Sequence, residues 1–225
     1  MFEKFASPFK EFGPAGIFYI AHRVLQRISP DFTVQFYELM AQPLAEKPLL
    51  PARLGKNVVV REVKRDDPAV GLMELSDEVL ALRFNQPTVC LGAFQKDTFI
   101  GSMWFCIGPY EEDEVRCTFV PQPESDGVFD FGLEVLPKYR LGVGFVALWD
   151  GANRYFRDRG YRYSFSRVSR FNLTSRRVHE RFGWFCLGRA LFVKLKRFQF
   201  MVATVAPYLH FSASASSRPK ICLRA

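Results

Sequence analysis

The sequence has few cysteines, and they follow no pattern that would bind a metal or build a disulfide framework. They are odd in number and widely spread, with no C-x-x-C pair and no metal-type spacing to histidine. We therefore expect free thiols, most of them buried, and no metal site. The five are Cys90, Cys106, Cys117, Cys186 and Cys222.

Long apolar runs and a secretory leader are also missing. No segment approaches the roughly 20 apolar residues that a membrane-spanning helix needs. Residues 1–10 mix charge with Phe instead of placing basic residues before an apolar run. The default expectation is a cytoplasmic protein. An apolar fraction of 48%, with 24 Phe residues, supplies a substantial core and argues against a disordered chain.

Acidic residues are fewer than basic ones, which gives a formal net charge of +8. The charge favours acidic partners: the phosphates of a nucleotide cofactor, an acidic carrier protein, a nucleic acid or an anionic lipid surface. A generally basic, solvated surface explains it equally well. No nucleic-acid-binding motif accompanies the basic residues, so no nucleic-acid partner is expected. The acidic run at 111–114 predicts a solvated loop.

The N-terminal part predicts a helical extension over residues 1–54. Ile17, Ile20, Val24, Leu25 and Ile28 have helical spacing, with basic side chains between them. This amphipathic helix either packs on the protein's own core or makes a peripheral contact with an anionic membrane. A second short helix is predicted over 32–40, followed by a proline-containing connector. At the other end, residues 206–225 are expected to be a flexible tail.

Residues 55–205 predict one domain of mixed strands and helices. Val58 begins a β-branched strand, and Asp67 with Pro68 suits the start of a helix. The order of elements excludes a pure sandwich and a helical bundle, so the fold class is α+β, or mixed α/β. Strands are predicted over 58–63, 89–94, 98–107, 128–136, 161–168 and 186–196, and helices over 66–83, 145–156 and 172–182.

A glycine-containing loop joins the strand at 128–136 to the helix that follows it. Such a turn leaves backbone N–H groups free at the positive end of the helix dipole, where a pyrophosphate can bind. Gly142 and Gly144 would let the chain approach the anion, and Arg140 would add a charged donor. A tight turn with no ligand would have the same sequence.

Three local patterns resemble the GNAT acyltransferase family. The first is the hairpin over 91–101, and the second is 135–140 followed by the two loop glycines. The third is the most specific, a set spaced like the family's Asn, small residue, Tyr, acidic residue, Gly and aromatic residue. Its members here are Asn172, Ser175, His179, Glu180, Gly183 and Trp184. The resemblance covers roughly residues 55–200.

The resemblance implies a mixed, mostly antiparallel sheet with a splayed central strand pair and flanking helices. It also implies transfer of an acetyl or other acyl group from acyl-CoA, as co-substrate, to a primary amine. Glu134 is the candidate base and His179 the candidate acid, with Asp130 as a reserve base expected on the same strand face as Glu134 by the period of two. The implied cofactor-binding residues are Leu133, Val135, Arg140, Leu141, Gly142, Val143, Gly144, Phe145, Asn172 and Ser175.

Two positions depart from the family pattern. Arg140 is followed by one residue before Gly142 instead of two, so the loop is one residue short. The family's frequent tyrosine, which protonates the leaving thiolate, is replaced by His179. An imidazole with an ordinary pKa near ~6.5 can donate that proton.

Two other functions remain open. One is a synthase that takes longer acyl chains from acyl carrier protein, and the other is an idle GNAT-like binding module. The acceptor is a small-molecule or peptide amine of unspecified kind. Six arginines near the predicted site, which either attract an acidic partner or form a solvated face, are Arg162, Arg167, Arg170, Arg176, Arg177 and Arg181. The oligomeric state is not predicted.

Overall fold

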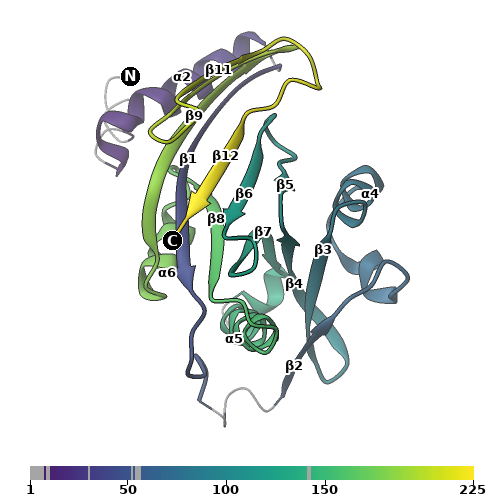
Figure 1. Ribbon diagram of the computed structural model, residues 1–225. Coiled ribbons are helices and arrows are strands. Elements are labelled where there is room, and N and C mark those ends of the chain that lie inside the picture. Colours follow the sequence, from purple (N-terminus) through teal and green to yellow (C-terminus); the bar gives the residue numbers. More distant parts are fainter. Residues whose placement is uncertain (1–7, 9–10, 30, 52, 54–56, 141–142) are drawn as a thin grey trace. The chain divides into compact units, whose positions relative to one another are not determined.

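A computed structural model describes residues 8, 11–29, 31–51, 53, 57–140 and 143–225. The helices and strands are shown in Figure 1. By its internal contacts the chain divides into two compact units. Unit 1 comprises Met1–Ala41, Glu111–Phe119 and Arg167–Ala225, and unit 2 comprises Gln42–Tyr110 and Val120–Ser166. None of the described helices is long and apolar enough to cross a bilayer.

Unit 2 contains strands in the order β8-β7-β4-β3-β2. The β7–β8 pair is parallel, and the other three pairs are antiparallel. Lys96 and Asp97, both at positive φ, form the two-residue turn of the predicted hairpin. This mixed architecture confirms the predicted fold class. The strands are β2 (Val58–Glu62), β3 (Thr88–Gln95), β4 (Thr98–Ile107), β7 (Gly127–Val135) and β8 (Tyr163–Ser169), which continues into unit 1.

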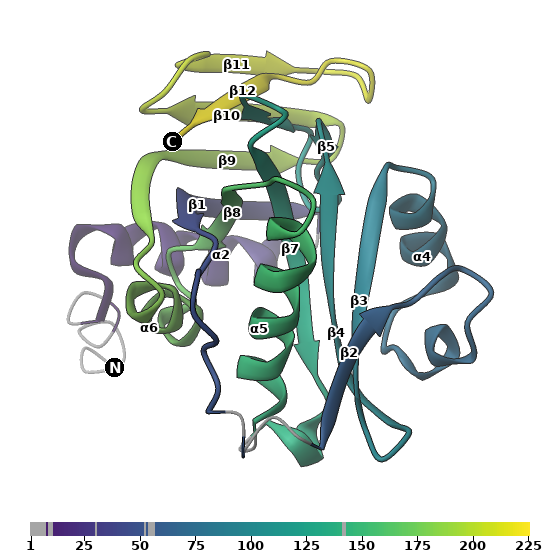
Figure 2. The same ribbon diagram turned by 60° about the horizontal axis from the view of Figure 1, so that its bottom comes forward.

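Two helices of unit 2, α4 (Asp77–Phe84) and α5 (Gly144–Arg157), cover opposite faces of these strands (Figure 2). The ring of Phe84 in α4 lies 4.8 Å from that of Trp104, and Phe156 in α5 lies 4.5 Å from Phe105. Because consecutive residues of a strand point to opposite faces, these two contacts place the helices on different sides. The core of unit 2 is thus aromatic on both faces of β4.

The predicted continuous helix over 66–83 is wrong, because the structure divides it. A 3-10 helix, η2 (Pro68–Leu72), is capped by Asp67, whose carboxylate accepts from the Ala69 N–H at 2.9 Å. Met73 is extended, and Ser76 then caps α4. A second N-cap residue followed by two acidic residues favours a new helix start over continuation.

Unit 1 contains strands in the order β11-β10-β9-β1, all antiparallel. The amphipathic helix α2 (Gly16–Ile28) packs on β1: the Val34 N–H donates to His22 Nδ1 at 3.1 Å, and the Phe18 and Phe36 rings are 5.6 Å apart. The other elements are β1 (Phe32–Pro43), β9 (Phe185–Leu195), β10 (Phe198–Ala203), β11 (Leu209–Ser212), the 3-10 helix η1 (Gly13–Ala15) and α6 (Leu173–Arg181).

The predicted helix over 32–40 is wrong, since these residues form strand β1. The strand pairs with β9 from Phe32 opposite Leu195 to Ala41 opposite Phe185. Its β-branched and aromatic residues suit a strand, but the partner that decides the matter is distant in the sequence. Residues 32–43 are therefore part of a sheet.

The predicted flexible tail instead contains β11 and a further strand, β12 (Lys220–Arg224). β12 joins β6 (Thr118–Gln122), where the Thr118 N–H donates to the Pro219 carbonyl at 2.9 Å. Ile221 and Leu223 are buried, with 0% and 1% of their surface exposed. The short strand β5 (Tyr110–Glu111) includes the first residue of the acidic run.

We expect the C-terminal strand to contribute to stability. Ile221→Ala should lower the free energy of unfolding by about 2–4 kcal/mol, because it removes a fully buried side chain. Cys222→Ala, at the exposed neighbouring position, is the matched control and should change it by less than about 0.5 kcal/mol. Urea unfolding measures both. Equal, small effects would mean that β12 is not part of the core.

Candidate functional site

A β-bulge at Gly132 shapes the end of β7. Trp104 of β4 lies opposite Phe131, whereas Met103 lies opposite Leu133, so β7 has one extra residue between them. Gly132 has φ +69°, a conformation that favours glycine, and a Cβ there would lie 2.8 Å from the Arg83 guanidinium. Bulges bend a strand and redirect its side chains, often beside functional sites.

The bulge separates the two carboxylates that were predicted to share a face. Asp130 lies on the face of Leu133 and Val135, and Glu134 lies on the opposite face, because the extra residue resets the alternation. Asp130 is also buried and accepts from Ser164 Oγ at 2.6 Å. The prediction of Asp130 as a reserve base beside Glu134 is therefore wrong.

Past the bulge, β7 runs beyond its parallel ladder. In the described part of unit 2, this ladder pairs Gly127–Asp130 with Tyr163–Ser166. The next residues of β7 are paired with β4 on the other side, as far as Val135 opposite Gly101. A strand edge beyond the end of its ladder presents backbone N–H and C=O groups to another occupant. Leu133 and the half-buried Glu134 lie on this segment.

Arg140 holds the following loop to the end of β7. Its Nε–H donates to the Val135 carbonyl at 2.9 Å, across the short 3-10 helix η3 (Pro137–Tyr139). The predicted roles had Arg140 at a pyrophosphate and the Val135 backbone at a thioester. In the structure the Arg140 Nε–H donates to the Val135 carbonyl instead. The two outer guanidinium nitrogens of this exposed side chain take no part in that bond. Leu141 and Gly142 lie outside the described residues.

Helix α5 begins just after this loop, with Val143 as its N-cap and no side-chain cap among the described residues. The backbone N–H groups of its first turn, including that of the half-buried Phe145, are at the positive end of the dipole. Gly144 has a packing role: a Cβ there would lie 3.1 Å from Ile100 Cδ1. The glycine is therefore explained by contact with β4, without a ligand.

The remaining predicted site residues belong to α6 in unit 1. Asn172 Oδ1 accepts from the Ser175 N–H at 3.0 Å, so the predicted helix cap is confirmed. His179 is buried, with 6% of its surface exposed, and its carbonyl accepts from the Phe182 and Trp184 N–H groups. The end of α6 thus fixes the backbone of His179.

Four of the six arginines near the predicted site have acidic partners. Arg167 binds the buried Glu112 through two bonds of 2.6 and 2.7 Å, and Arg162 lies 3.7 Å from Asp126. Within unit 1, Glu38 binds Arg170 and also Arg176, the latter at 2.8 Å. These are structural ion pairs. Burial of Glu112 also corrects the prediction that the acidic run is wholly solvated.

Arg162, Arg177 and Arg181 are exposed, and of these Arg162 lies 3.7 Å from Asp126. Arg177 and Arg181 are the remaining members of the set. Both lie on α6, Arg177 directly after Arg176 and Arg181 two residues after His179, and Arg181 adds positive charge to the last turn of the helix. Any attraction of an acidic partner by the predicted cluster would therefore depend chiefly on these two side chains.

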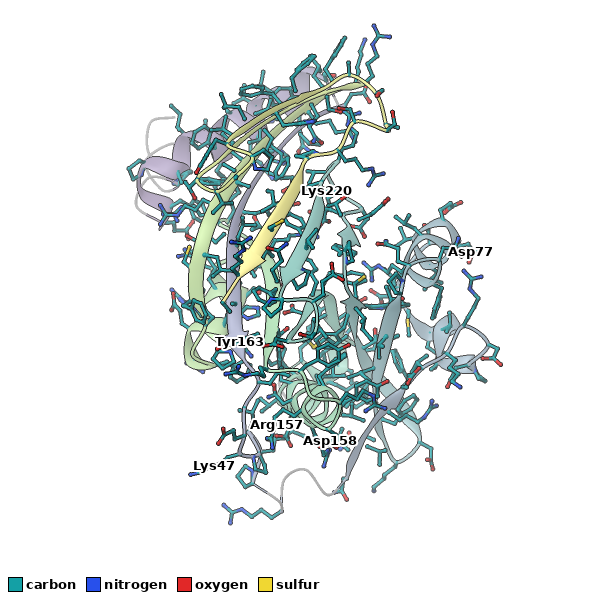
Figure 3. The ribbon with its side chains drawn as sticks, in the orientation of Figure 1. Lys47, Asp77, Arg157, Asp158, Tyr163 and Lys220 are labelled. Atoms are coloured by element: carbon teal, nitrogen blue, oxygen red, sulfur yellow. The ribbon has the colours of Figure 1, made fainter. Side chains whose placement is uncertain are left out.

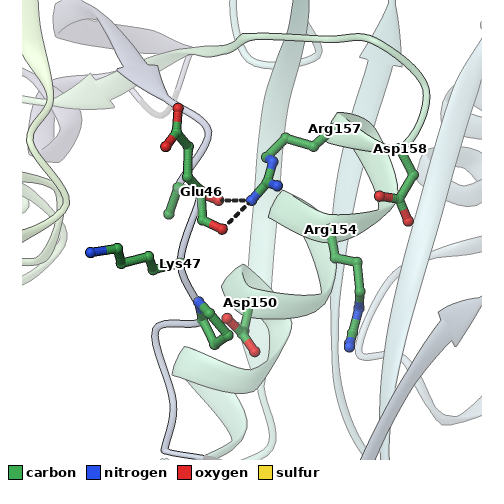
Figure 4. Close-up of a pocket in the computed structure, with 8 residues that line it drawn as sticks. Glu46, Lys47, Asp150, Arg154, Arg157 and Asp158 are labelled. Carbon is green, nitrogen blue, oxygen red and sulfur yellow. Dashed lines mark hydrogen bonds between the residues drawn. The ribbon is translucent and has the colours of Figure 1, made fainter.

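A hollow of about 280 Å³ lies between α5 and the connector at 45–48 (Figures 3 and 4). Arg157 donates to the carbonyls of Ala45 and Glu46 at 2.7 and 2.5 Å, and Asp150 accepts from the Leu49 N–H at 2.6 Å. Both charged groups thus bind the connector's backbone. These bonds attach the connector to α5 along the hollow.

Comparison with known proteins gives matches among solved structures only. No family model matches this chain. No curated protein matches it either. A functionally unknown conserved protein from Staphylococcus epidermidis is 12% identical, with 76% of this chain and 66% of that chain covered and a TM-score of 0.48. A tandem GNAT protein from the clavulanic acid biosynthesis pathway is 14% identical, with 76% and 54% covered and a TM-score of 0.49.

The aminoglycoside N-acetyltransferase AAC(6')-Iy, in complex with CoA, is 19% identical, with 56% of this chain and 90% of that chain covered and a TM-score of 0.42. The chain spans 66%, 57% and 54% of the length of three of the structures it matches. Because identities this low say nothing about chemistry, function has to be inferred from this chain's own residues.

The five cysteines divide into a buried and an exposed class. Cys90, Cys106 and Cys117 are buried, while Cys186 and Cys222 are exposed. Burial raises the pKa of Cys90 and of Cys106 to about 12 and raises that of Cys117 as well. The buried thiols therefore stay protonated near neutral pH, where the thiolate is the reactive form. Burial therefore disfavours these thiols as nucleophiles.

Alkylation should separate the two classes of cysteine. Iodoacetamide at pH 8 should modify Cys186 and Cys222 in the native protein, and all five cysteines only after denaturation. Mass spectrometry of peptides measures the modification at each site. Modification of Cys90 or Cys106 in the native protein, at the rate seen for Cys222, would contradict this assignment.

Proposed function

We propose that this chain is an N-acyltransferase of the GNAT type, which transfers an acetyl or other acyl group from acyl-CoA to a primary amine. The observation that carries the proposal is the segment of β7 beyond the described pairs of its parallel ladder. A loop follows it, and then the start of α5, where no described side chain caps the helix. An acyl thioester carrier has an amide-containing arm and a pyrophosphate. A free strand edge suits the arm, and helix N–H groups suit the anion.

The residues of unit 2 fit such a co-substrate. The backbone of Leu133 on the open segment would bind the amide-containing arm. The first-turn N–H groups of α5, at Gly144 and Phe145, would hold the phosphates. Arg140 would act in two ways, through Nε as the anchor of the loop and through its outer nitrogens as a donor to the anion.

The reaction needs a neutral amine, a polarised thioester carbonyl and a proton for the leaving thiolate. Glu134 would accept a proton from the attacking amine, directly or through water. The amine nitrogen then bonds to the thioester carbon, the carbon–sulfur bond breaks, and His179 would protonate the departing sulfur. Two different residues would therefore act as base and acid.

A second function, acyl transfer from acyl carrier protein, is favoured by one observation. The Arg140 Nε–H is bonded to Val135, so one of the predicted pyrophosphate donors is partly used by the chain itself. Weaker binding of free CoA would follow. A carrier protein could compensate through its acidic surface, because the chain has a net charge of +8.

Binding measurements distinguish the two donors. Calorimetric titration with acetyl-CoA should give saturable binding if CoA is the donor. Binding of acylated carrier protein without saturable binding of acetyl-CoA would instead support the second function. If the protein binds neither acetyl-CoA nor acylated carrier protein, the acyltransferase proposal is contradicted.

Glu134→Gln should lower kcat by about 10²–10⁴-fold with little change in KM for the acyl donor, because it removes a general base but preserves shape. Release of the free CoA thiol, measured with a set of primary amines, provides the assay. Glu124→Gln, at an exposed loop position, is the matched control and should keep full activity. Equal activity of the two variants would eliminate the base role.

His179→Gln tests the acid. We expect a loss of kcat and a loss of the basic limb of the pH–rate profile, because the amide cannot donate as imidazolium does. Since His179 is buried, thermal unfolding must be measured in parallel. A stability loss with an unchanged pH profile of the remaining activity would show that the residue is structural.

A further inference from the structure

The sheet of unit 1 has an exposed face that is apolar on neighbouring strands. Along β10, Phe198, Phe200 and Val202 are exposed, and they alternate with buried residues. Phe200 lies opposite Phe211 of β11, which is 61% exposed. We call this surface the apolar face, and its members are Leu195, Phe198, Phe200, Val202, Leu209 and Phe211.

Helix α2 packs on the same face at β1. The ring of Phe36 in β1 lies 5.6 Å from that of Phe18 in α2, Phe36 lies opposite Leu191 of β9, and Leu191 lies opposite Val202. Residues opposite each other in a ladder point to the same side, so α2 and the apolar face share one side of the sheet. The outer part of α2 adds two more exposed apolar residues two turns apart, Ile17 and Val24.

The elements that carry this surface have basic residues and no acidic ones. Helix α2 contains Arg23 and Arg27 and neither Asp nor Glu. After Glu180 the sequence contains no acidic residue at all. The basic residues of this C-terminal stretch are Arg181, Arg189, Lys194, Lys196, Arg197, Arg218, Lys220 and Arg224.

Two of these cations adjoin the apolar face directly. Lys196 and Arg197 form the turn between β9 and β10, and both are exposed. The guanidinium of Arg197 lies 4.9 Å from the ring centre of Phe198. The surface therefore combines large apolar side chains with positive charge at its edge.

Charge decides which occupant this surface suits. A second copy of the chain would bring the same cations together, with no carboxylate on these elements to neutralise them. An anionic bilayer offers both complements, because its acyl region accepts Phe and Leu side chains and its headgroups attract Lys and Arg. We propose that unit 1 binds an anionic lipid surface through the apolar face, with Lys196 and Arg197 at the headgroups.

Flotation with vesicles tests the charge contribution. The protein should float with vesicles of phosphatidylcholine mixed with phosphatidylglycerol and much less with phosphatidylcholine alone. Lys196→Glu combined with Arg197→Glu should reduce partitioning by roughly 25-fold or more, at about fivefold for each cation lost. The matched control, Lys47→Glu with Lys64→Glu, changes the net charge equally at exposed positions of unit 2 and should bind as the wild type does.

A second pair of variants tests the apolar contribution. Phe200→Ser with Phe211→Ser should lower binding to the mixed vesicles at least tenfold, whereas Val59→Ser with Leu72→Ser, at exposed positions of unit 2, should not. Circular dichroism checks that each variant is folded. Phe211→Trp keeps the face apolar and adds a fluorescent probe. When this variant binds the mixed vesicles, brominated acyl chains should quench the tryptophan fluorescence.

Three results would overturn the proposal. The first is absence of flotation with the mixed vesicles. The second is binding that falls no further in the face variants than in their controls. The third is a wild-type dimer in gel filtration that Phe200→Ser with Phe211→Ser converts to a monomer, because the occupant would then be a second copy.

Discussion

The bulge at Gly132 is the constraint on which the candidate site depends. One extra residue in β7 bends the strand and puts Glu134 and Asp130 on opposite faces. It also lies just past the last described pair of the parallel ladder to β8, Asp130 with Ser166. Without the positive φ that this glycine accepts, the face on which Glu134 lies would change.

Local contacts then hold the segment that follows. Arg140 donates to the Val135 carbonyl, and Gly144 at the start of α5 packs closely on Ile100 of β4. The start of α5 has the positive end of the helix dipole at its first turn, beside this contact.

Some basic residues of this chain form internal ion pairs, and others lie on elements that contain no acidic residue. Buried carboxylates such as Glu112 and Glu38 bind arginines that could otherwise be counted as a basic patch. The cations near Phe198, in contrast, have no acidic residue on their own elements. A net charge of +8 thus says little until each arginine is assigned a partner. The second group provides an attractive surface for an anionic partner.

The sequence by itself determined the elements whose signals are local. These are the hairpin turning at Lys96 and Asp97, the helix cap at Asn172 and the strand–loop–helix over β7 and α5. It indicated the GNAT-like order of elements and hence Glu134 as a candidate base. A glycine inside a strand pattern, such as Gly132, was an available signal for a bulge.

Tertiary structure alone decided β1, the strands of the C-terminal segment and the face on which Asp130 lies. The physical reason is that strands are stabilised by partners far away in the sequence, so a short segment does not reveal its own pairing. β1 becomes a strand because β9 is its partner, and β12 because Ile221 and Leu223 enter the core. Register has the same origin, since one inserted residue reverses every later side chain.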